Sequence, residues 1–170
     1  MTLEVPGSIR IPVGVVAERR PGATQWAEHA WLAREVLEDA PALPPWTVLR
    51  EEAGRTLFFA GLADVALHPT DTDNYIHNLQ QESPRIWVVL RPAEQAPGYR
   101  LQAVTVDAGE AQLYAESGSD LLESLPIPPG LRAILEAFVA EHHKQREFHK
   151  RKRDRADTES LGRRSRLEGA

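Results

Sequence analysis

The sequence predicts an α+β protein with a mainly antiparallel, curved or barrel-like sheet of six to seven strands. Two short helices, a C-terminal amphipathic helix and a disordered basic tail complete the predicted fold. Three observations support it. Short apolar runs bounded by Pro or Gly recur through the first 125 residues. Residues 85–106 read as two strands around a proline turn. An apolar stripe at helical spacing begins at Leu131.

The first strand is predicted from Ile9, because apolar residues alternate from there to Val15. Pro12 has no amide hydrogen to donate, so this strand is expected at a sheet edge or with a bulge at the proline. The turn residues 19–22 then end the strand.

Residues 24–38 fit either a helix or a strand. Their Ala, Leu, Glu and Arg content favours a helix by propensity. A strand over His29–Leu37 is preferred, because the preceding strand needs a partner and no other apolar run lies close. The helical alternative stays open.

Residues 39–45 are predicted as a loop, because three prolines there preclude regular structure. The segments 46–52 and 55–62 then flank Ala53 and Gly54, which is the signal of a β-hairpin. A short helix is expected to begin at residues 69–71, with Thr70 or Asp71 as its cap, and to end before Pro84. The residues of this helix expected to face the core are Tyr75, Ile76 and Leu79.

Residues 86–90 form a continuous apolar run, which is typical of a strand buried on both faces. Residues 99–106 are its expected antiparallel partner. Asp107 and Glu110 have the spacing of a capping box, so a helix is predicted from Ala108 to about Gly118. Residues 120–125 are predicted as the last strand, followed by a rigid proline connector over 126–130.

The C-terminal helix is the most regular element of the pattern. Its apolar positions recur at intervals of three and four residues from Leu131 to His142. The segment after His149 has almost no apolar content and is expected to be disordered. The predicted organisation is therefore a disordered N-terminus (1–7), one α+β domain (8–148) and a basic tail (149–170).

Charge is unevenly placed along the chain. The net charge is −5. Residues 141–170 hold ten Lys and Arg against six Asp and Glu, or +4, whereas the preceding residues hold ten against nineteen, or −9. An acidic domain thus carries a basic tail. The cluster Lys150, Arg151, Lys152, Arg153 and Arg155 is the predicted partner-binding site, with a solvated tail as the alternative interpretation.

Composition and motifs exclude several classes of protein. The chain has no Cys, which excludes disulfides, thiolate metal sites and a Cys nucleophile and is typical of the reducing cytosol. No apolar run reaches the roughly 18 residues of a membrane span, so a cytoplasmic location is expected. The phosphate-binding glycine loops, the GxSxG elbow and the HExxH motif are all missing from the sequence. No catalytic residue is predicted.

One segment has the spacing of metal ligands. Asp73 and His77 lie four residues apart on a predicted helix, with Asp71 just before them. A capped helix start with a solvent-exposed histidine explains the same pattern and is preferred, so no bound metal or cofactor is predicted. The tryptophans Trp26, Trp31, Trp46 and Trp87 are interpreted as packing residues rather than as an aromatic pocket.

Several segments together resemble a known family. They include IRIPVGVVAERRPG, PWTVLREEAGRTLFFAG, ESPRIWVVLRP and LESLPIPPGL. Over about residues 8–155 they resemble a proteobacterial domain family of unknown function. Its members are encoded near molybdenum-dependent formate dehydrogenase genes, and some are labelled molybdopterin-guanine dinucleotide biosynthesis proteins. The resemblance supplies no catalytic motif.

This resemblance implies a non-enzymatic accessory or assembly factor for a molybdenum-dependent oxidoreductase such as formate dehydrogenase. The expected partner is a molybdoenzyme subunit or maturation factor. The alternative is a nucleotide- or cofactor-processing enzyme in molybdopterin cofactor biosynthesis, so enzyme activity stays open. The guanylyltransferase class needs a Gly-rich loop with Arg and Lys after its first strand, whereas residues 16–22 hold one Gly and no Lys. Nucleic-acid binding through the tail is a further alternative, which the acidic body disfavours.

Overall fold

The computed structural model describes residues 5–24 and 29–153. In this part of the chain it shows seven strands, three α-helices and one 3₁₀ turn. The strands are β1 (Ile9–Pro21), β2 (His29–Leu37), β3 (Thr47–Glu52), β4 (Arg55–Leu67), β5 (Arg85–Pro92), β6 (Tyr99–Thr105) and β7 (Leu121–Pro126). The helical elements are η1 (Pro69–Asp71), α1 (Thr72–Leu79), α2 (Ala108–Ala115) and α3 (Pro129–Arg153).

The strands form two antiparallel sheets, which corrects the predicted single sheet. One sheet has the order β2-β1-β4-β3, and the other has the order β6-β5-β7. Neither sheet closes into a barrel, so the predicted barrel-like shape is wrong. The α+β class, the antiparallel pairing and the two short helices are confirmed.

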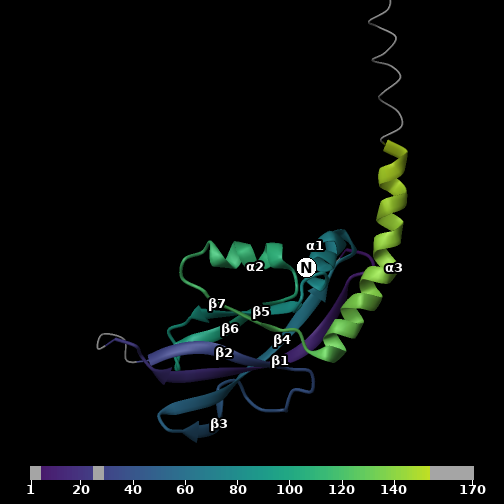
Figure 1. The fold of residues 1–170 in the computed structure, drawn as a ribbon. Helices are drawn as coiled ribbons and strands as arrows, with labels where there is room; N and C mark the ends of the chain where they lie inside the picture. The colour runs from purple at the N-terminus through teal and green to yellow at the C-terminus, as the bar shows by residue number, and fades with distance from the viewer. Residues whose placement is uncertain (1–4, 25–28, 154–170) are drawn as a thin grey trace, which may run out of the picture.

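The two sheets lie face to face, with β6 against β4 and β7 against β2. One apolar core fills the space between them and includes Val15 of β1, Val65 of β4 and Val88 of β5. Helix α2 packs on all three strands of the smaller sheet, on its side away from the larger sheet (Figure 1). The smaller sheet is therefore a middle layer, which explains why β5 is apolar on both faces.

Strand β1 lies inside the larger sheet, whereas the sequence predicted either an edge position or a bulge at Pro12, and the register with β4 shifts only at Val15 and Val16. Pro12 is nevertheless accommodated, because β2 pairs with β1 only from Gly14 onward. Pro12 is paired with β4 alone, opposite Asp64. Among the described residues, the proline therefore occupies a part of β1 that has a neighbouring strand on one side only, so an amide donor is not needed on the other side.

Both neighbours of β1 carry an extra residue at the same level of the sheet. Arg34 has no pairing partner in the register of β2, and Ala60 has none in the register of β4. Gly61, next to Ala60, has φ of +129°, a conformation that side-chain-bearing residues rarely adopt. Bulges of this kind increase strand twist and change the direction of a side chain. Here the bulge positions Arg34 to reach Glu18 of β1.

The predicted hairpins and the strand over residues 29–37 are confirmed. β3 and β4 are joined by Ala53 and Gly54, which both have positive φ, as the tight turn of a hairpin requires. β5 and β6 pair antiparallel across the proline turn. β2 pairs with β1 in an antiparallel ladder that begins with Pro21 opposite His29.

Helix α1 is held by two buried polar side chains. The amide of Asn78 accepts a hydrogen bond from the backbone N–H of Arg85 (2.8 Å) and donates to the carbonyls of Arg85 (2.7 Å) and Val106 (3.0 Å). Asn78 thereby joins the end of α1 to β5 and to the residue after β6. The hydroxyl of Tyr75 accepts a hydrogen bond from the backbone N–H of His68 (2.9 Å). Burial of the hydroxyl raises the pKa of Tyr75 to about 12.

Helix α2 begins at the predicted cap. The Asp107 carboxylate accepts hydrogen bonds from the backbone N–H groups of Gly109 (2.8 Å) and Glu110 (3.4 Å). Glu110 does not reach back to the Asp107 N–H directly. It accepts from the hydroxyl of Thr105, and that hydroxyl in turn accepts from the Asp107 N–H. Thr105 therefore completes the capping box.

Helix α3 buries Leu131, Leu135 and Phe138 in the core and packs on α1. Its backbone is helical through Arg153, four residues beyond the predicted boundary at His149. The C-terminal half of α3 extends away from the two sheets (Figure 1). Among the described helices, none combines the length and the apolar character needed to cross a membrane.

Candidate functional site

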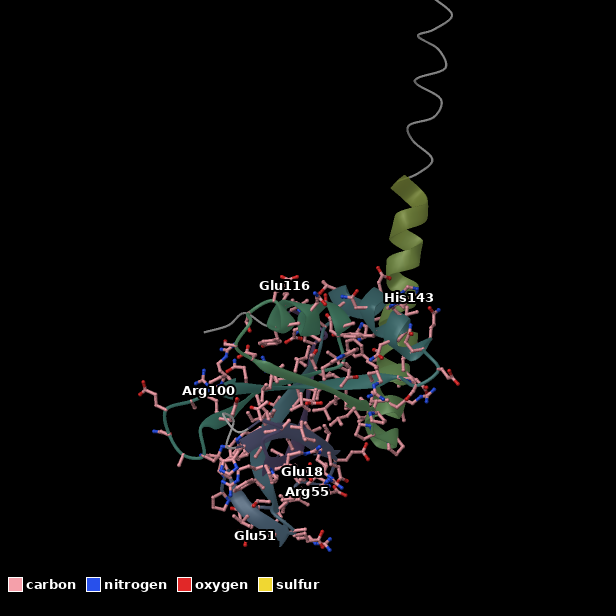
Figure 2. The ribbon with its side chains drawn as sticks, turned by 60° about the vertical axis from the view of Figure 1, so that its left-hand side comes forward. Glu18, Glu51, Arg55, Arg100, Glu116 and His143 are labelled. Atoms are coloured by element: carbon pink, nitrogen blue, oxygen red, sulfur yellow. The ribbon has the colours of Figure 1, made fainter. Side chains whose placement is uncertain are left out.

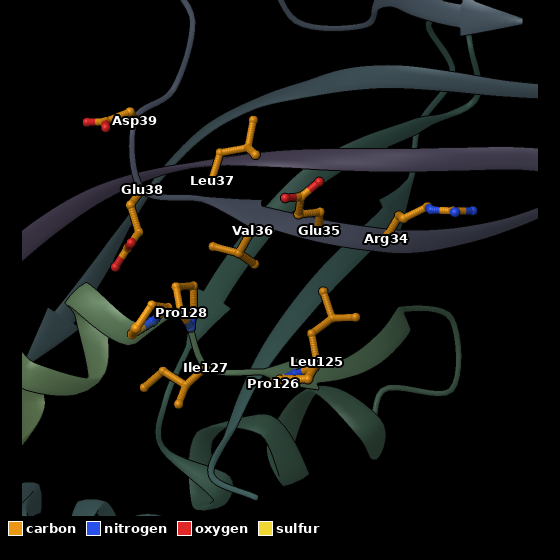
Figure 3. Close-up of a pocket in the computed structure, with 11 residues that line it drawn as sticks. Arg34, Glu35, Val36, Leu37, Glu38, Asp39, Leu125, Pro126, Ile127 and Pro128 are labelled. Carbon is orange, nitrogen blue, oxygen red and sulfur yellow. The ribbon is translucent and has the colours of Figure 1, made fainter.

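A groove of about 560 Å³ lies where the two sheets meet at one side of the molecule. One wall is the end of β2 with the two residues that follow it, and the other wall is the end of β7 with the proline connector to α3 (Figure 3). β2 and β7 are each the outermost strand of their sheet. Each therefore has a strand neighbour on one side only, within the described residues.

The groove has an apolar floor and an acidic rim. Val36 and Ile127 are buried, and Val36 points across the groove toward the connector (Figure 3). The carboxylates of Glu35 and Asp39 are exposed on the β2 side. The ends of β2 and β7 thus offer a ligand both apolar contact and negative charge. The complete lining consists of residues 34–39 and 125–129.

Glu38 connects the two walls. Its carboxylate accepts a hydrogen bond from the backbone N–H of Leu131, in the first turn of α3 (2.6 Å). A Cβ added to Gly130 would lie 2.4 Å from the Glu38 Oε1 atom, so only glycine leaves room for this contact. The negative carboxylate also complements the positive end of the helix dipole. Glu38 therefore fixes the start of α3 against the end of β2.

A second cavity of about 320 Å³ lies on the other side of Glu38 and Asp39. It is lined by the first residues of β1 and by the first turn and a half of α3, including Ile134, which is 41% exposed. The apolar surface of the groove thus continues beyond Glu38 and Asp39 into this second cavity.

The sequence did not indicate the role of Glu38, because 93 residues separate it from Leu131. A signal was nevertheless present. Residues 126–130, around the start of α3, read PIPPG and contain no Ser, Thr, Asp or Asn to cap the helix. A helix start without a local cap needs an acceptor from elsewhere in the chain.

A buried ion cluster supports the β2 wall. The side chain of Glu18 is 1% exposed and accepts hydrogen bonds from Arg20 (2.7 Å) and from Arg34 (2.8 Å), which lines the groove. Arg55 contributes positive charge to the same environment (Figure 2). Burial acts to raise the pKa of Glu18, but the hydrogen bond from Arg20 and the surrounding arginine charges outweigh it. The net effect lowers the pKa of Glu18 below its ordinary value of 4.5.

The Glu18→Gln variant is expected to lose roughly 1–2 kcal/mol of stability at neutral pH. This is less than the roughly 3–5 kcal/mol for breaking a fully buried pair, because both arginines are partly exposed to water. Since folding lowers this carboxyl pKa, its contribution is complete above about pH 4.5 and disappears as pH falls through the lower folded-state pKa. Urea unfolding of both proteins between about pH 7 and 3 should show the difference shrinking toward acid.

Glu51→Gln is the matched control for this measurement, because Glu51 is exposed on β3. Its stability should stay within about 0.5 kcal/mol of the native protein. A Glu18→Gln difference that is constant across this pH range would contradict the assigned role of the carboxylate.

The predicted metal-ligand segment is not assembled as a cluster. Asp73 lies with its Oδ1 atom 3.8 Å from Nδ1 of His143 on α3. Asp71 stands at the cap of α1 without a side-chain capping hydrogen bond, and His77 lies in the last turn. Among the described residues, no group of three or more His, Asp or Glu side chains is placed to hold a metal ion. The contact with His143 was not predicted from the sequence.

The predicted partner-binding cluster falls partly within the described chain. Lys150, Arg151, Lys152 and Arg153 belong to the last turns of α3, while Arg155 lies outside the described residues. The backbone therefore places the first four of these residues on the part of α3 that extends from the body (Figure 1). Their role in binding stays a prediction.

Two of the four tryptophans pack together. Trp31 and Trp46 have ring centroids 5.6 Å apart, and Phe58 and Tyr99 complete the cluster. The guanidinium of Arg19 lies 5.2 Å from the Phe58 ring centroid and 5.8 Å from that of Trp31. Trp87 lies elsewhere, on β5, and Trp26 is outside the described residues.

The comparisons with known proteins identify a family model that matches the chain but assign no activity. A family model described as "Protein of unknown function (DUF3305)" matches residues 12–152, which is most of the chain. This description names no reaction, partner or cofactor. Neither the curated proteins nor the solved structures gave a match.

Proposed function

The chain belongs to the DUF3305 family of proteins of unknown function, and we propose that it is a non-enzymatic accessory protein that binds a protein partner in the cytoplasm. The observation that carries this proposal is the groove between the edge strands β2 and β7. An edge strand has unpaired backbone donors and acceptors, and an extended peptide can add to them as a further strand. Two such edges lie together here.

The lining of the groove indicates the chemistry of the bound segment. Apolar side chains of the segment would contact Val36 and Ile127, which form the floor. Lys or Arg side chains would approach Glu35 and Asp39, which are exposed at the rim. An extended peptide that mixes apolar and basic residues therefore fits this site best.

We propose a molybdenum-dependent oxidoreductase such as formate dehydrogenase, or one of its maturation factors, as the partner. This step is supported by the family that the sequence resembles, because members of that family are encoded near such enzymes. The basic cluster Lys150, Arg151, Lys152, Arg153 and Arg155 would provide a second contact with the same partner, at an acidic surface. The groove lies at the start of α3, and the residues 150–153 of the cluster lie at the other end of this helix.

Affinity purification of the tagged full-length protein from its native cells tests both contacts. The native chain is expected to recover formate dehydrogenase subunits or their maturation factors, identified by mass spectrometry. The double variant Glu35→Lys/Asp39→Lys should recover them about tenfold less, since two attractive charges become repulsive. The control Glu82→Lys/Glu116→Lys makes the same charge change at exposed positions outside the groove and should recover the native amount.

Each contact can fail separately in this experiment. Native recovery with the groove variant would remove the groove from the interface. Native recovery after replacing all five residues of the basic cluster by Gln would remove that cluster. If the native chain itself recovers no molybdoenzyme component, the proposed partner is wrong.

A further inference from the structure

We propose that in the free protein the groove is occupied by the chain's own C-terminal segment Leu161–Leu167, which competes with the partner. This inference rests on the same groove as the proposed function, but it concerns a contact that needs no partner. It follows from the lining of the groove, from the sequence of the segment and from the length of chain that connects them.

The segment has the composition that the groove requires. Its sequence is LGRRSRL, with three Arg side chains between two Leu side chains. Leu161 and Leu167 are the only large apolar residues after Phe148. The arginines complement the carboxylates of Glu35 and Asp39, and the leucines complement the buried floor.

The connecting chain is long enough to bring this segment to the groove. α3 begins at the groove with Pro129 and ends at Arg153, a distance of about 36 Å at roughly 1.5 Å per residue. Returning along the helix, an extended chain needs about eleven residues to cover the same distance, at roughly 3.3 Å per residue. Counted from Arg153, that places Arg164 at the groove, in the centre of the segment.

The residues that precede this segment in the tail are less suited to bind in the groove. Asp154, Asp157 and Glu159 precede it and carry the same sign of charge as the groove. They would lie along the returning chain rather than at the acidic rim. Because the segment is tethered, its effective concentration at the groove is about millimolar, so even a weak contact would reduce access by a partner.

Paramagnetic NMR on the full-length chain tests this contact directly. The native sequence has no Cys, so the Gly169→Cys variant accepts a single spin label beside the segment without altering it. At about 0.05 M salt the label is expected to broaden the backbone amide signals of Val36, Leu37 and Ile127. About 0.5 M salt should restore these signals, because it screens the charges. Reversing Arg163, Arg164 and Arg166 to Glu in the labelled chain should restore them as well.

The possible outcomes separate the two proposals. Sharp groove signals at low salt would overturn the self-contact and leave the partner-binding groove unaffected. Broadening that appears only when labelled and isotope-enriched copies are mixed would show a contact between molecules and overturn the intramolecular form. If the self-contact is present, the same three Arg→Glu changes should raise partner recovery at least about threefold. Equal recovery would overturn the competition.

Discussion

Replacing Asn78 with alanine is expected to destabilise the protein by about 3 kcal/mol. The variant removes three hydrogen bonds at once, and Asn78 is only 2% exposed, so water cannot replace them. The N–H and C=O groups of Arg85 and the C=O of Val106 would be left without this partner. An unsatisfied buried polar group costs about 1–3 kcal/mol, and the three groups lie close enough for their costs to overlap.

Equilibrium unfolding in urea measures this effect, and Asn74→Ala is its matched control. Asn74 lies on the same helix but is exposed, and its side chain donates one hydrogen bond to Asp107 (3.0 Å). The control should lose less than about 1 kcal/mol. Equal losses in the two variants would contradict a special role for the buried amide of Asn78, because Ala has the higher helix propensity and its introduction cannot itself cause a loss.

The single variant Leu135→Ala is expected to lower the free energy of unfolding by about 3 kcal/mol. Leu135 is fully buried in the core that α3 shares with both sheets. Truncation removes apolar contact and leaves a cavity, for which Leu→Ala changes in protein cores cost about 2–5 kcal/mol. The loss should also loosen the first turns of α3, where Glu38 holds the helix at the groove.

Ile134→Ala is the matched control for Leu135→Ala, because it truncates a side chain on the exposed side of α3. Ile134 is the preceding residue and is 41% exposed, so its truncation should cost less than about 1 kcal/mol. Thermal or urea unfolding of the two variants compares them directly. A cost at Ile134 as large as that at Leu135 would contradict the docking of α3 through the face that carries Leu135.

Local chemistry made most individual elements predictable from the sequence. Ala53 and Gly54 specify a tight turn whatever surrounds them, so the hairpin of β3 and β4 was predicted correctly. Asp107 caps α2 through contacts with residues two and three positions later. The strand His29–Leu37 was resolved from an ambiguous pattern only because β1 needed a partner.

The arrangement of these elements was less predictable, for a physical reason. A strand's apolar pattern shows which side chains are buried but does not show which other strand covers them. Seven strands of this kind fit one curved sheet as well as two facing sheets, and the division into two is set by contacts between β4 and β6 and between β2 and β7. The groove depends on this division, so its walls could not be assigned from the sequence.

The central position of β1 determines when the fold can form during synthesis. β1 is the first strand of the described chain, yet its longest pairing is with β4, which ends at Leu67. The core closes only with Leu135 and Phe138, near the C-terminal end of the described chain. Contacts between residues so far apart in sequence slow folding. The apolar face of β1 therefore stays partly uncovered during synthesis until α3 has also been made, which exposes it to non-native contacts in the meantime.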